Sequence, residues 1–262
     1  MTKNKSKAKV TVYIAVAALL AILTAAALFT LPITAASGLK RIPVLTYHRI
    51  MARPRPNYRV PTVPPSVFER QMAYLARHGY RTISPDQLVA YYQGRASLPE
   101  KPVLITFDDG WVDNYTTAFP ILKKFGYQAT VFLVAGKIGT GQLLNWEQIR
   151  EMSGYGITFG AHTMTHPHLT SLEAGPAARE IAESKATIEA HLGRPVDFFA
   201  YPYGDGAFNE EIRGLVQKAG FKAAFASSLG LVTTFRDPLA LRRILITDHS
   251  WLSWLEFATM VR

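Results

Sequence analysis

Cysteine is absent from the 262 residues of this sequence. Disulfide bonds and thiolate metal ligands are therefore excluded, so any metal site must use histidine and carboxylate side chains. The chain also lacks a block of lysine and arginine with interleaved aromatic residues, which argues against nucleic acid as a partner. Four of its 29 basic residues lie among the first nine residues, and the other 25 exceed the 19 acidic residues by six. This mild excess slightly favours anionic polymers or surfaces as partners.

Charged residues are also missing from residues 10–31, which form a long apolar run. The run is about as long as a bilayer-spanning helix requires, and longer than the ~7–15 residues of a signal-peptide core. We predict a transmembrane signal anchor there, with residues 1–9 as a basic cytoplasmic tail and 32–39 as a linker. Residues 40–262 would then lie outside the cytoplasm, in the periplasm or at the cell surface. Cleavage in the small-residue stretch near Ala36 would instead give a secreted form.

After residue 40, apolar strand-like runs alternate with amphipathic helical patterns. The runs are mostly continuous rather than alternating, which is typical of parallel strands buried on both faces. We therefore predict one domain over residues 40–262, an α/β fold with a distorted (β/α) barrel of about seven strands. In such barrels the reactive groups lie at the carboxyl ends of the strands. The principal runs are "IPVLTYH", "KPVLITF", "ATVFLVA", "GITFGA", "FFAYP", "KAAFASS" and "LRRILIT".

The segment "VLITFDDGWVDN" ends one of these strands with two adjacent carboxylates, Asp108 and Asp109. Neighbouring acids at the end of a buried strand repel each other and lose hydration, so they need a cation or hydrogen-bond donors nearby. An ordinary Asp-Gly turn is the alternative interpretation. We expect Asp113 and Asn114 to cap the helix after this segment.

The segment "ITFGAHTMTHPHL" ends another strand with three of the chain's seven histidines. His162 and His166 are four residues apart, and both rings can face one point if the backbone turns after Ala161. His168 follows Pro167 and is expected to point away from that pair in a structural role. Two imidazoles and one carboxylate make a three-ligand site with open positions, which is the catalytic pattern for zinc and similar ions.

Together with "YPYG" at residues 201–204, these two motifs resemble the polysaccharide deacetylase family, the NodB homology domain of carbohydrate esterase family 4. The resemblance extends from residue 42 to the end of the chain. It implies metal-dependent hydrolysis of N-acetyl groups on amino-sugar polymers. The metal would be a divalent transition ion, zinc before cobalt, nickel or iron. The resemblance implies a general base at Asp108, metal ligands at Asp109, His162 and His166, and an oxyanion donor at the backbone N–H of Tyr203.

This chemistry also needs a general acid, because an amine leaves poorly without a proton. A bound cation would polarise the amide carbonyl and activate water, and Asp108 would take the proton of that water. The family pattern places the acid, a histidine after a strand, near the carboxyl terminus, where this chain offers His249. The context of His249, between Asp248 and Ser250, suits helix capping. We favour His48, after the strand "IPVLTYH", as in the permuted subgroup resembling enzymes that deacetylate poly-β-1,6-N-acetylglucosamine.

The sequence departs from the family pattern at two places. Ala200 stands where an arginine normally steadies the base, and we predict that Arg243 replaces it, although the neighbouring Arg242 is the alternative. The fourth family motif is not recognisable, so the pocket for the acetyl methyl group is undefined. Trp111 is a candidate for stacking on sugar. Candidates to line the acetyl pocket are Leu245, Trp251 and Trp254.

We therefore predict a membrane-anchored N-deacetylase of N-acetylglucosamine polymers, with poly-β-1,6-N-acetylglucosamine favoured over peptidoglycan and chitooligosaccharides. Its partners would be the polysaccharide, the membrane and proteins of exopolysaccharide synthesis or export. One alternative is a carbohydrate-binding protein that kept the fold and lost turnover. Another is a phosphohydrolase with Asp108 as nucleophile. The histidine pair disfavours the latter, because magnesium prefers oxygen ligands.

Overall fold

The computed structural model describes residue 40 and residues 42–52, 60–227 and 237–247. Within these ranges no helix is both long and apolar enough to cross a membrane. The predicted anchor at 10–31 and linker at 32–39 lie outside the described residues, as do His249, Trp251 and Trp254. The described part of the chain thus begins after the predicted linker and ends at residue 247.

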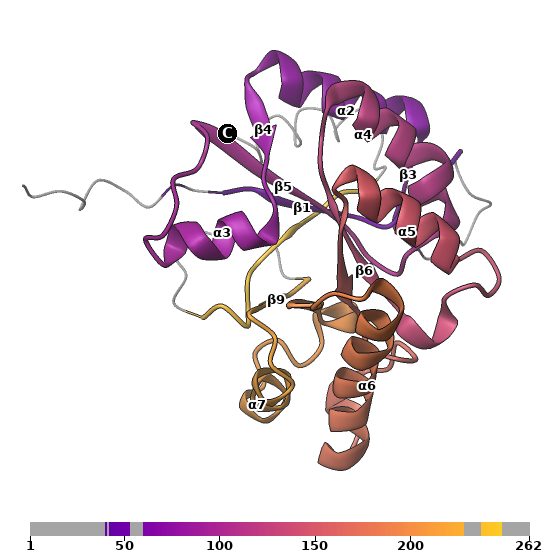
Figure 1. Ribbon diagram of the computed structural model, residues 1–262, viewed down its shortest axis with the longest axis vertical. Coiled ribbons are helices and arrows are strands. Elements are labelled where there is room, and N and C mark those ends of the chain that lie inside the picture. The colour runs from indigo at the N-terminus through magenta and orange to yellow at the C-terminus, as the bar shows by residue number, and fades with distance from the viewer. Residues whose placement is uncertain (1–39, 41, 53–59, 228–236, 248–262) are drawn as a thin grey trace, which may run out of the picture. The chain divides into compact units, whose positions relative to one another are not determined.

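A parallel sheet forms the centre of this region (Figure 1). Its strand order is β10-β1-β5-β6-β7-β8-β9. Each neighbouring pair in this order is parallel. A further strand, β4 (Tyr80–Thr82), pairs with the first residues of β5, and β2 (Arg49–Ile50) pairs separately with β3 (Thr62–Val63). The bounds of the main strands are β1 Val44–Tyr47, β5 Lys101–Phe107, β6 Thr130–Leu133, β7 Thr158–Ala161, β8 Phe198–Ala200, β9 Ala223–Phe225 and β10 Ile244–Leu245.

The sheet curls so that its two edges are joined through the same short segment. Leu241 bridges Phe225 of β9, and four residues later Leu245 of β10 pairs with Thr46 of β1. The predicted α/β fold with about seven parallel strands is therefore confirmed, in the form of a curled half-barrel rather than a regular barrel. The run "LRRILIT" contributes only a two-residue strand because it makes contacts on both edges in turn.

Helices follow most strands, and their ends have clear local causes. Ser84 and Asn145 each form a capping box with the glutamine three residues later, which starts α3 and α5. Gly126, Gly156 and Gly193 adopt left-handed backbone conformations that end α4, α5 and α6. The helix bounds are α2 Pro65–Arg77, α3 Pro85–Tyr92, α4 Phe119–Phe125, α5 Trp146–Tyr155, α6 Ala174–Leu192 and α7 Glu210–Lys218.

Both faces of the sheet are buried, which explains the continuous apolar runs. Along β6, Val131 and Leu133 belong to the larger apolar cluster, whereas Phe132 between them belongs to a second cluster. The second cluster also contains Phe198 and Phe225. Because successive side chains of a strand point to opposite faces, Phe132 and its cluster line the face of the sheet opposite to the larger cluster. The polar loops follow the carboxyl ends of these strands.

Gly160 of β7 provides a test of how tightly the face that carries Phe132 is packed. A Cβ at this position would lie 2.5 Å from ring carbons of Phe132 and 2.8 Å from the carbonyl oxygen of Phe198. We expect Gly160→Ala to lower the free energy of unfolding by about 1–3 kcal/mol, because these atoms have little room to shift. Urea titration followed by circular dichroism measures this. Gly154→Ala in α5, where nothing lies within 4 Å, is the control and should be neutral or slightly stabilising. Equal stability of the two variants would contradict the packing argument.

Candidate active site

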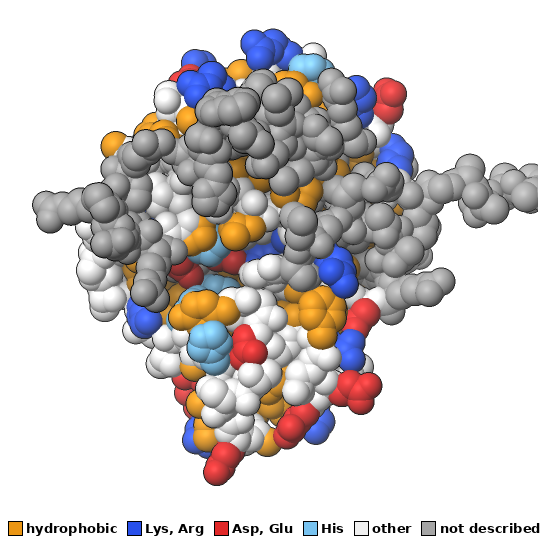
Figure 2. Space-filling model, turned by 180° about the vertical axis from the view of Figure 1, so that it is seen from behind, with side chains coloured by type: hydrophobic (Ala, Val, Ile, Leu, Met, Phe, Trp, Pro, Cys, Tyr) orange, Lys and Arg blue, Asp and Glu red, His pale blue; other side chains and the backbone are white. Residues whose placement is uncertain are grey.

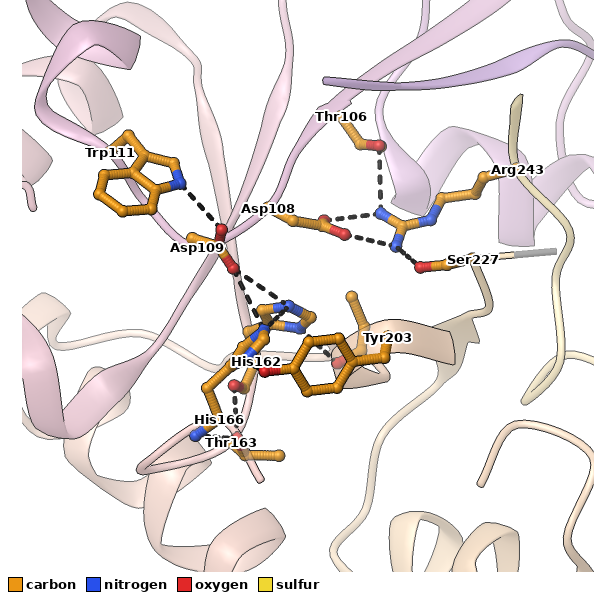
Figure 3. A network of polar contacts seen from close by, with 11 residues as sticks. Thr106, Asp108, Asp109, Trp111, His162, Thr163, His166, Tyr203, Ser227 and Arg243 are labelled. Carbon is orange, nitrogen blue, oxygen red and sulfur yellow. Dashed lines mark hydrogen bonds and ion pairs between the residues drawn. The ribbon is translucent and has the colours of Figure 1, made fainter. Parts of the chain in front are cut away.

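The loops that follow β5, β7 and β8 bring the predicted site residues together at the carboxyl ends of these strands (Figure 3). Asp109 comes from the first loop, His162 and His166 from the second, and Tyr203 from the third. On the face shown in Figure 2, histidine and acidic side chains gather in a hollow beside hydrophobic side chains. The site is therefore assembled from segments that are far apart in the sequence, at the carboxyl ends of parallel strands.

One carboxylate and two imidazoles form the candidate metal centre. Nε2 of His166 and Nε2 of His162 lie 3.3 and 3.6 Å from Oδ1 of Asp109, and 3.2 Å from each other. One ligand atom from each of the three residues lies within 4.8 Å of the others. His162 is buried, and the other two side chains are mostly buried. This is the donor set of a three-ligand transition-metal site that leaves positions open for water and substrate.

The outer nitrogens of both rings are engaged, and this fixes how the rings face inward. Nδ1 of His162 lies 2.7 Å from the carbonyl oxygen of Ala200, so it must carry the hydrogen and leave the Nε2 lone pair free. Nδ1 of His166 lies 3.1 Å from the hydroxyl of Tyr203. Burial lowers the pKa of His162 to about 4, although Asp108 opposes the shift, so this ring is neutral at pH 7. Two rings that direct nitrogens at one carboxylate fit a cation between them.

The backbone at the site is held in an unusual conformation. Among the described residues, the non-glycine residues with positive φ are Asp109, Thr163, His166 and Tyr203, with φ of 73°, 64°, 69° and 59°. The left-handed region costs such residues roughly 1–2 kcal/mol each, and it persists only where the surroundings enforce it. Gly110 is also left-handed and would clash with Leu133 if it had a side chain. Strain is thus concentrated where the candidate ligands are.

Asp108, the predicted base, is paired with the predicted Arg243. Both carboxylate oxygens accept hydrogen bonds of 2.7 Å from the two terminal guanidinium nitrogens, and both side chains are fully buried. Burial alone would raise the pKa of Asp108, but the charge and hydrogen bonds of Arg243 outweigh it and lower the pKa, so the carboxylate stays ionised. Arg242 lies instead with its guanidinium 5.2 Å from the ring centroid of Phe208. Arg243 therefore contacts Asp108, whereas Arg242 contacts Phe208.

His48, the predicted acid, lies beside this pair. Tyr47 of β1 pairs with Phe107 of β5, and the N–H of Asp108 donates to the carbonyl oxygen of Tyr47, so residues 48 and 108 leave neighbouring strands together. His48 is half-buried, and its Nδ1 is buried without a hydrogen-bond partner in the described part of the chain. The other ring nitrogen, Nε2, is therefore the one that could exchange a proton with substrate.

Asp113 and Asn114 do not cap the following helix, contrary to our prediction. Asp113 occupies the N-cap position without a capping hydrogen bond. Its carboxylate accepts instead from the backbone N–H of Ile50 at 2.8 Å and from Nε of Arg49 at 2.7 Å. Nδ2 of Asn114 donates to the carbonyl oxygen of His48 at 2.8 Å. The buried Arg49 needs an anionic partner, and meeting this need ties the loop after β5 to the segment that carries His48.

Trp111 and His168 contact the site in ways that the sequence did not indicate. Nε1 of Trp111 donates to Oδ2 of Asp109 at 2.8 Å, which leaves Oδ1 facing the histidines. The Trp111 ring also lies 4.4 Å from the guanidinium carbon of Arg49. The ring of His168 stacks on that of Tyr203, with centroids 4.1 Å apart. Leu245 is partly exposed, and nothing in the described residues places it in an acetyl pocket.

The buried pair of Arg243 and Asp108 generates a stability prediction. Arg243→Met keeps most of the volume but leaves a buried carboxylate without its cation, so the free energy of unfolding should fall by about 3–5 kcal/mol at neutral pH. Chemical denaturation of the variant and of the original chain measures the difference. The matched control is Arg242→Met, which removes an exposed guanidinium and should change stability by less than about 0.5 kcal/mol. Similar losses in both variants would mean that the pair contributes no more than a surface charge.

Comparison with known proteins gives the family. Residues 95–224 match the family model described as polysaccharide deacetylase. YxkH of Bacillus subtilis (strain 168), which is named as a polysaccharide deacetylase, is 32% identical over 207 residues, covering 79% of this chain and 72% of that protein. The poly-β-1,6-N-acetyl-D-glucosamine N-deacetylase of Staphylococcus aureus (strain MSSA476) is 29% identical, covering 72% of this chain and 69% of that protein.

Two solved structures show the same fold. The deacetylase PplD of Streptococcus pyogenes, in complex with acetate, superimposes with a TM-score of 0.77 at 27% identity and covers 84% of this chain and 99% of its own. IcaB of Ammonifex degensii gives a TM-score of 0.72 at 29% identity, with 84% and 98% covered. The match to the family model, the identity to YxkH and the shared fold agree: this chain belongs to the polysaccharide deacetylase family and is a hydrolase of carbon–nitrogen bonds.

Proposed function

We propose that this protein removes N-acetyl groups from an N-acetylglucosamine polymer, with poly-β-1,6-N-acetylglucosamine as its substrate. The observation that carries the proposal is the convergence of Asp109, His162 and His166 beside the ionised pair of Asp108 and Arg243. The choice of polymer draws on the relative from Staphylococcus aureus that is named for that substrate. Peptidoglycan glycans and chitooligosaccharides are the alternative substrates.

Each residue of the site has a part in this reaction. Asp109, His162 and His166 would hold a divalent transition ion, zinc before cobalt, nickel or iron. When bound, the ion polarises the amide carbonyl and makes water a better nucleophile. Asp108 takes a proton from the attacking water, and Arg243 keeps that carboxylate ionised and in place. The backbone N–H of Tyr203 donates to the developing oxyanion.

His48 completes the reaction by giving a proton to the departing amine. Its position at the end of β1, next to Asp108, supports this role. Asn114 fixes the backbone of His48, and Asp113 fixes the two residues after it, so the ring is held at a set place relative to the loop of Asp109. Such positioning matters because proton transfer requires the acid to be within hydrogen-bond reach of the leaving nitrogen.

We further propose that the domain acts outside the cytoplasm, anchored by residues 10–31 in the cell membrane. The charge-free run and the four lysines before it support this orientation. A secreted form would result from cleavage near Ala36. Exopolysaccharide synthesis or export proteins are the partners that such a location would make available.

A carbohydrate-binding protein without turnover is the alternative function. The absence of a recognisable fourth family motif favours it, whereas the complete ligand set and the Asp108–Arg243 pair oppose it. Binding of the polymer by the metal-loaded protein without any release of acetate would decide for this alternative.

Acetate release from the three glycans tests the proposed activity. The full-length chain, purified in mild detergent and loaded with Zn²⁺, should release acetate from poly-β-1,6-N-acetylglucosamine faster than from chitooligosaccharides or peptidoglycan. Asp108→Asn should lower the rate by roughly 10²–10⁴-fold, because the amide cannot accept the proton. Asp86→Asn, an exposed site in the first turn of α3, is the control and should retain the rate. Acetate release unaffected by Asp108→Asn would refute the base assignment.

The choice between the two candidate acids rests on a pair of variants. His48→Ala should lower kcat by roughly 10²-fold or more with polymeric substrate, since the amine then has no protein donor. His249→Ala should leave kcat within about twofold of the original. The reverse pattern would assign the proton to His249 and leave His48 with a structural role.

A further inference from the structure

The loop from His162 to His166 carries two of the three candidate ligands in an unfavourable backbone conformation. Thr163 and His166 both have positive φ, at 64° and 69°. Relaxation of either residue to an ordinary φ would turn the His166 ring away from His162. Hydrogen bonds must therefore hold the loop in this conformation.

Two sets of hydrogen bonds hold the loop, one within the loop itself and one from the segment that follows β6. The side chain of Thr163 donates to the carbonyl oxygen of His162 at 2.6 Å and accepts from the N–H of His166 at 3.0 Å. The carbonyl oxygens of Thr163 and Met164 accept from the N–H groups of Ala135 and Gly136, which follow β6. These bonds satisfy the carbonyl side of the loop. The N–H groups of Met164 and Thr165, on its other side, need an acceptor of their own.

That acceptor is the carboxylate of Glu180, which projects from α6. Its Oε2 accepts from the N–H of Met164 and the N–H of Thr165, both at 2.9 Å, and its Oε1 accepts from the hydroxyl of Thr165 at 2.7 Å. Successive N–H groups that converge after a left-handed residue form an anion-binding concavity. A carboxylate in such a concavity accepts charge-assisted hydrogen bonds that the loop can donate only in this conformation.

We propose that Glu180 is a positioning residue that holds the His162–His166 loop in its ligating conformation and thereby sets the affinity for the metal. The inference rests on the proposed metal site. With Glu180 present, the loop is arranged before the ion arrives. Without it, the ion must order two left-handed residues as it binds, so its affinity falls. Losses of such outer partners typically weaken metal binding by roughly 10–100-fold.

Zinc affinity of the full-length protein, measured by competition with a chromophoric chelator, tests this role. Glu180→Ala removes all three acceptor contacts and should raise the Kd for Zn²⁺ by roughly 10–100-fold. Glu180→Gln keeps an amide oxygen for the two N–H groups and should raise the Kd less than Glu180→Ala does. The matched control is Glu183→Ala, in the next turn of α6 and exposed, which should leave the Kd within about twofold of the original.

The outcomes separate this inference from the proposed function. If the original chain binds Zn²⁺ and Glu180→Ala binds it equally well, Glu180 has no positioning role while the metal site stands. If the original chain binds no Zn²⁺, the metal site itself fails. Far-UV circular dichroism of the metal-free variants shows whether they are folded. Should Glu180→Ala be unfolded, Glu180→Gln decides: a Kd equal to that of the original chain would overturn the role, and a raised Kd would support it.

Discussion

A guanidinium and a carboxylate, both fully buried, face each other at the carboxyl edge of the curled sheet, and much of the site depends on keeping them paired. Arg243 reaches Asp108 from a segment 135 residues away and also donates to the carbonyl oxygen of Ala226. Burying either ion without its partner would cost a large desolvation free energy. The pair therefore fixes the segment that carries Arg243 relative to the carboxyl end of β5. The loops that carry the candidate ligands start from the same ends of the strands.

Around this pair, each of the three candidate metal ligands is held by a neighbouring polar group. Ala200 orients His162, Tyr203 orients His166, and Trp111 orients Asp109. Asp113 and Asn114 connect the loop after β5 to β2 and to His48. The orientation of these side chains is fixed by hydrogen bonds within the protein, and electrostatic catalysis benefits from such preorganised groups because little reorganisation is then needed.

The sequence predicted the parts of this arrangement that depend on local pattern. Continuous apolar runs indicated parallel strands buried on both faces, and the motifs after them indicated which side chains meet at the carboxyl edge. The same reasoning narrowed the partner of Asp108 to Arg242 or Arg243, because neighbouring side chains of a strand point to opposite faces. In the structure the partner is Arg243. Family resemblance supplied the roles of the residues, which no periodicity could have given.

The partners of Asp113, Trp111 and Glu180 could not be predicted in this way. Asp113 looks like a helix cap because the local sequence favours one, yet its carboxylate goes to an N–H group 63 residues earlier. Glu180 lies in the middle of a long helix, where an acidic residue is ordinarily read as part of a solvated face. Such contacts form because the fold brings a buried charge or a strained loop next to an acceptor that is distant in the sequence. The residues that neighbour each partner in the sequence give no sign of the contact.

The four left-handed residues have a consequence for how far this protein can be stabilised. At Asp109 and His166 only glycine would relieve the backbone, and glycine would also delete the side chain that the site needs. Substitutions that raise thermal stability must therefore be sought in the helices and at the amino ends of the strands. The loops at the carboxyl ends of the strands keep their strained backbone. Substitutions in the helices and at the amino ends of the strands, away from Glu180, leave the hydrogen bonds of the site in place, so they can raise stability without altering the arrangement of the candidate ligands.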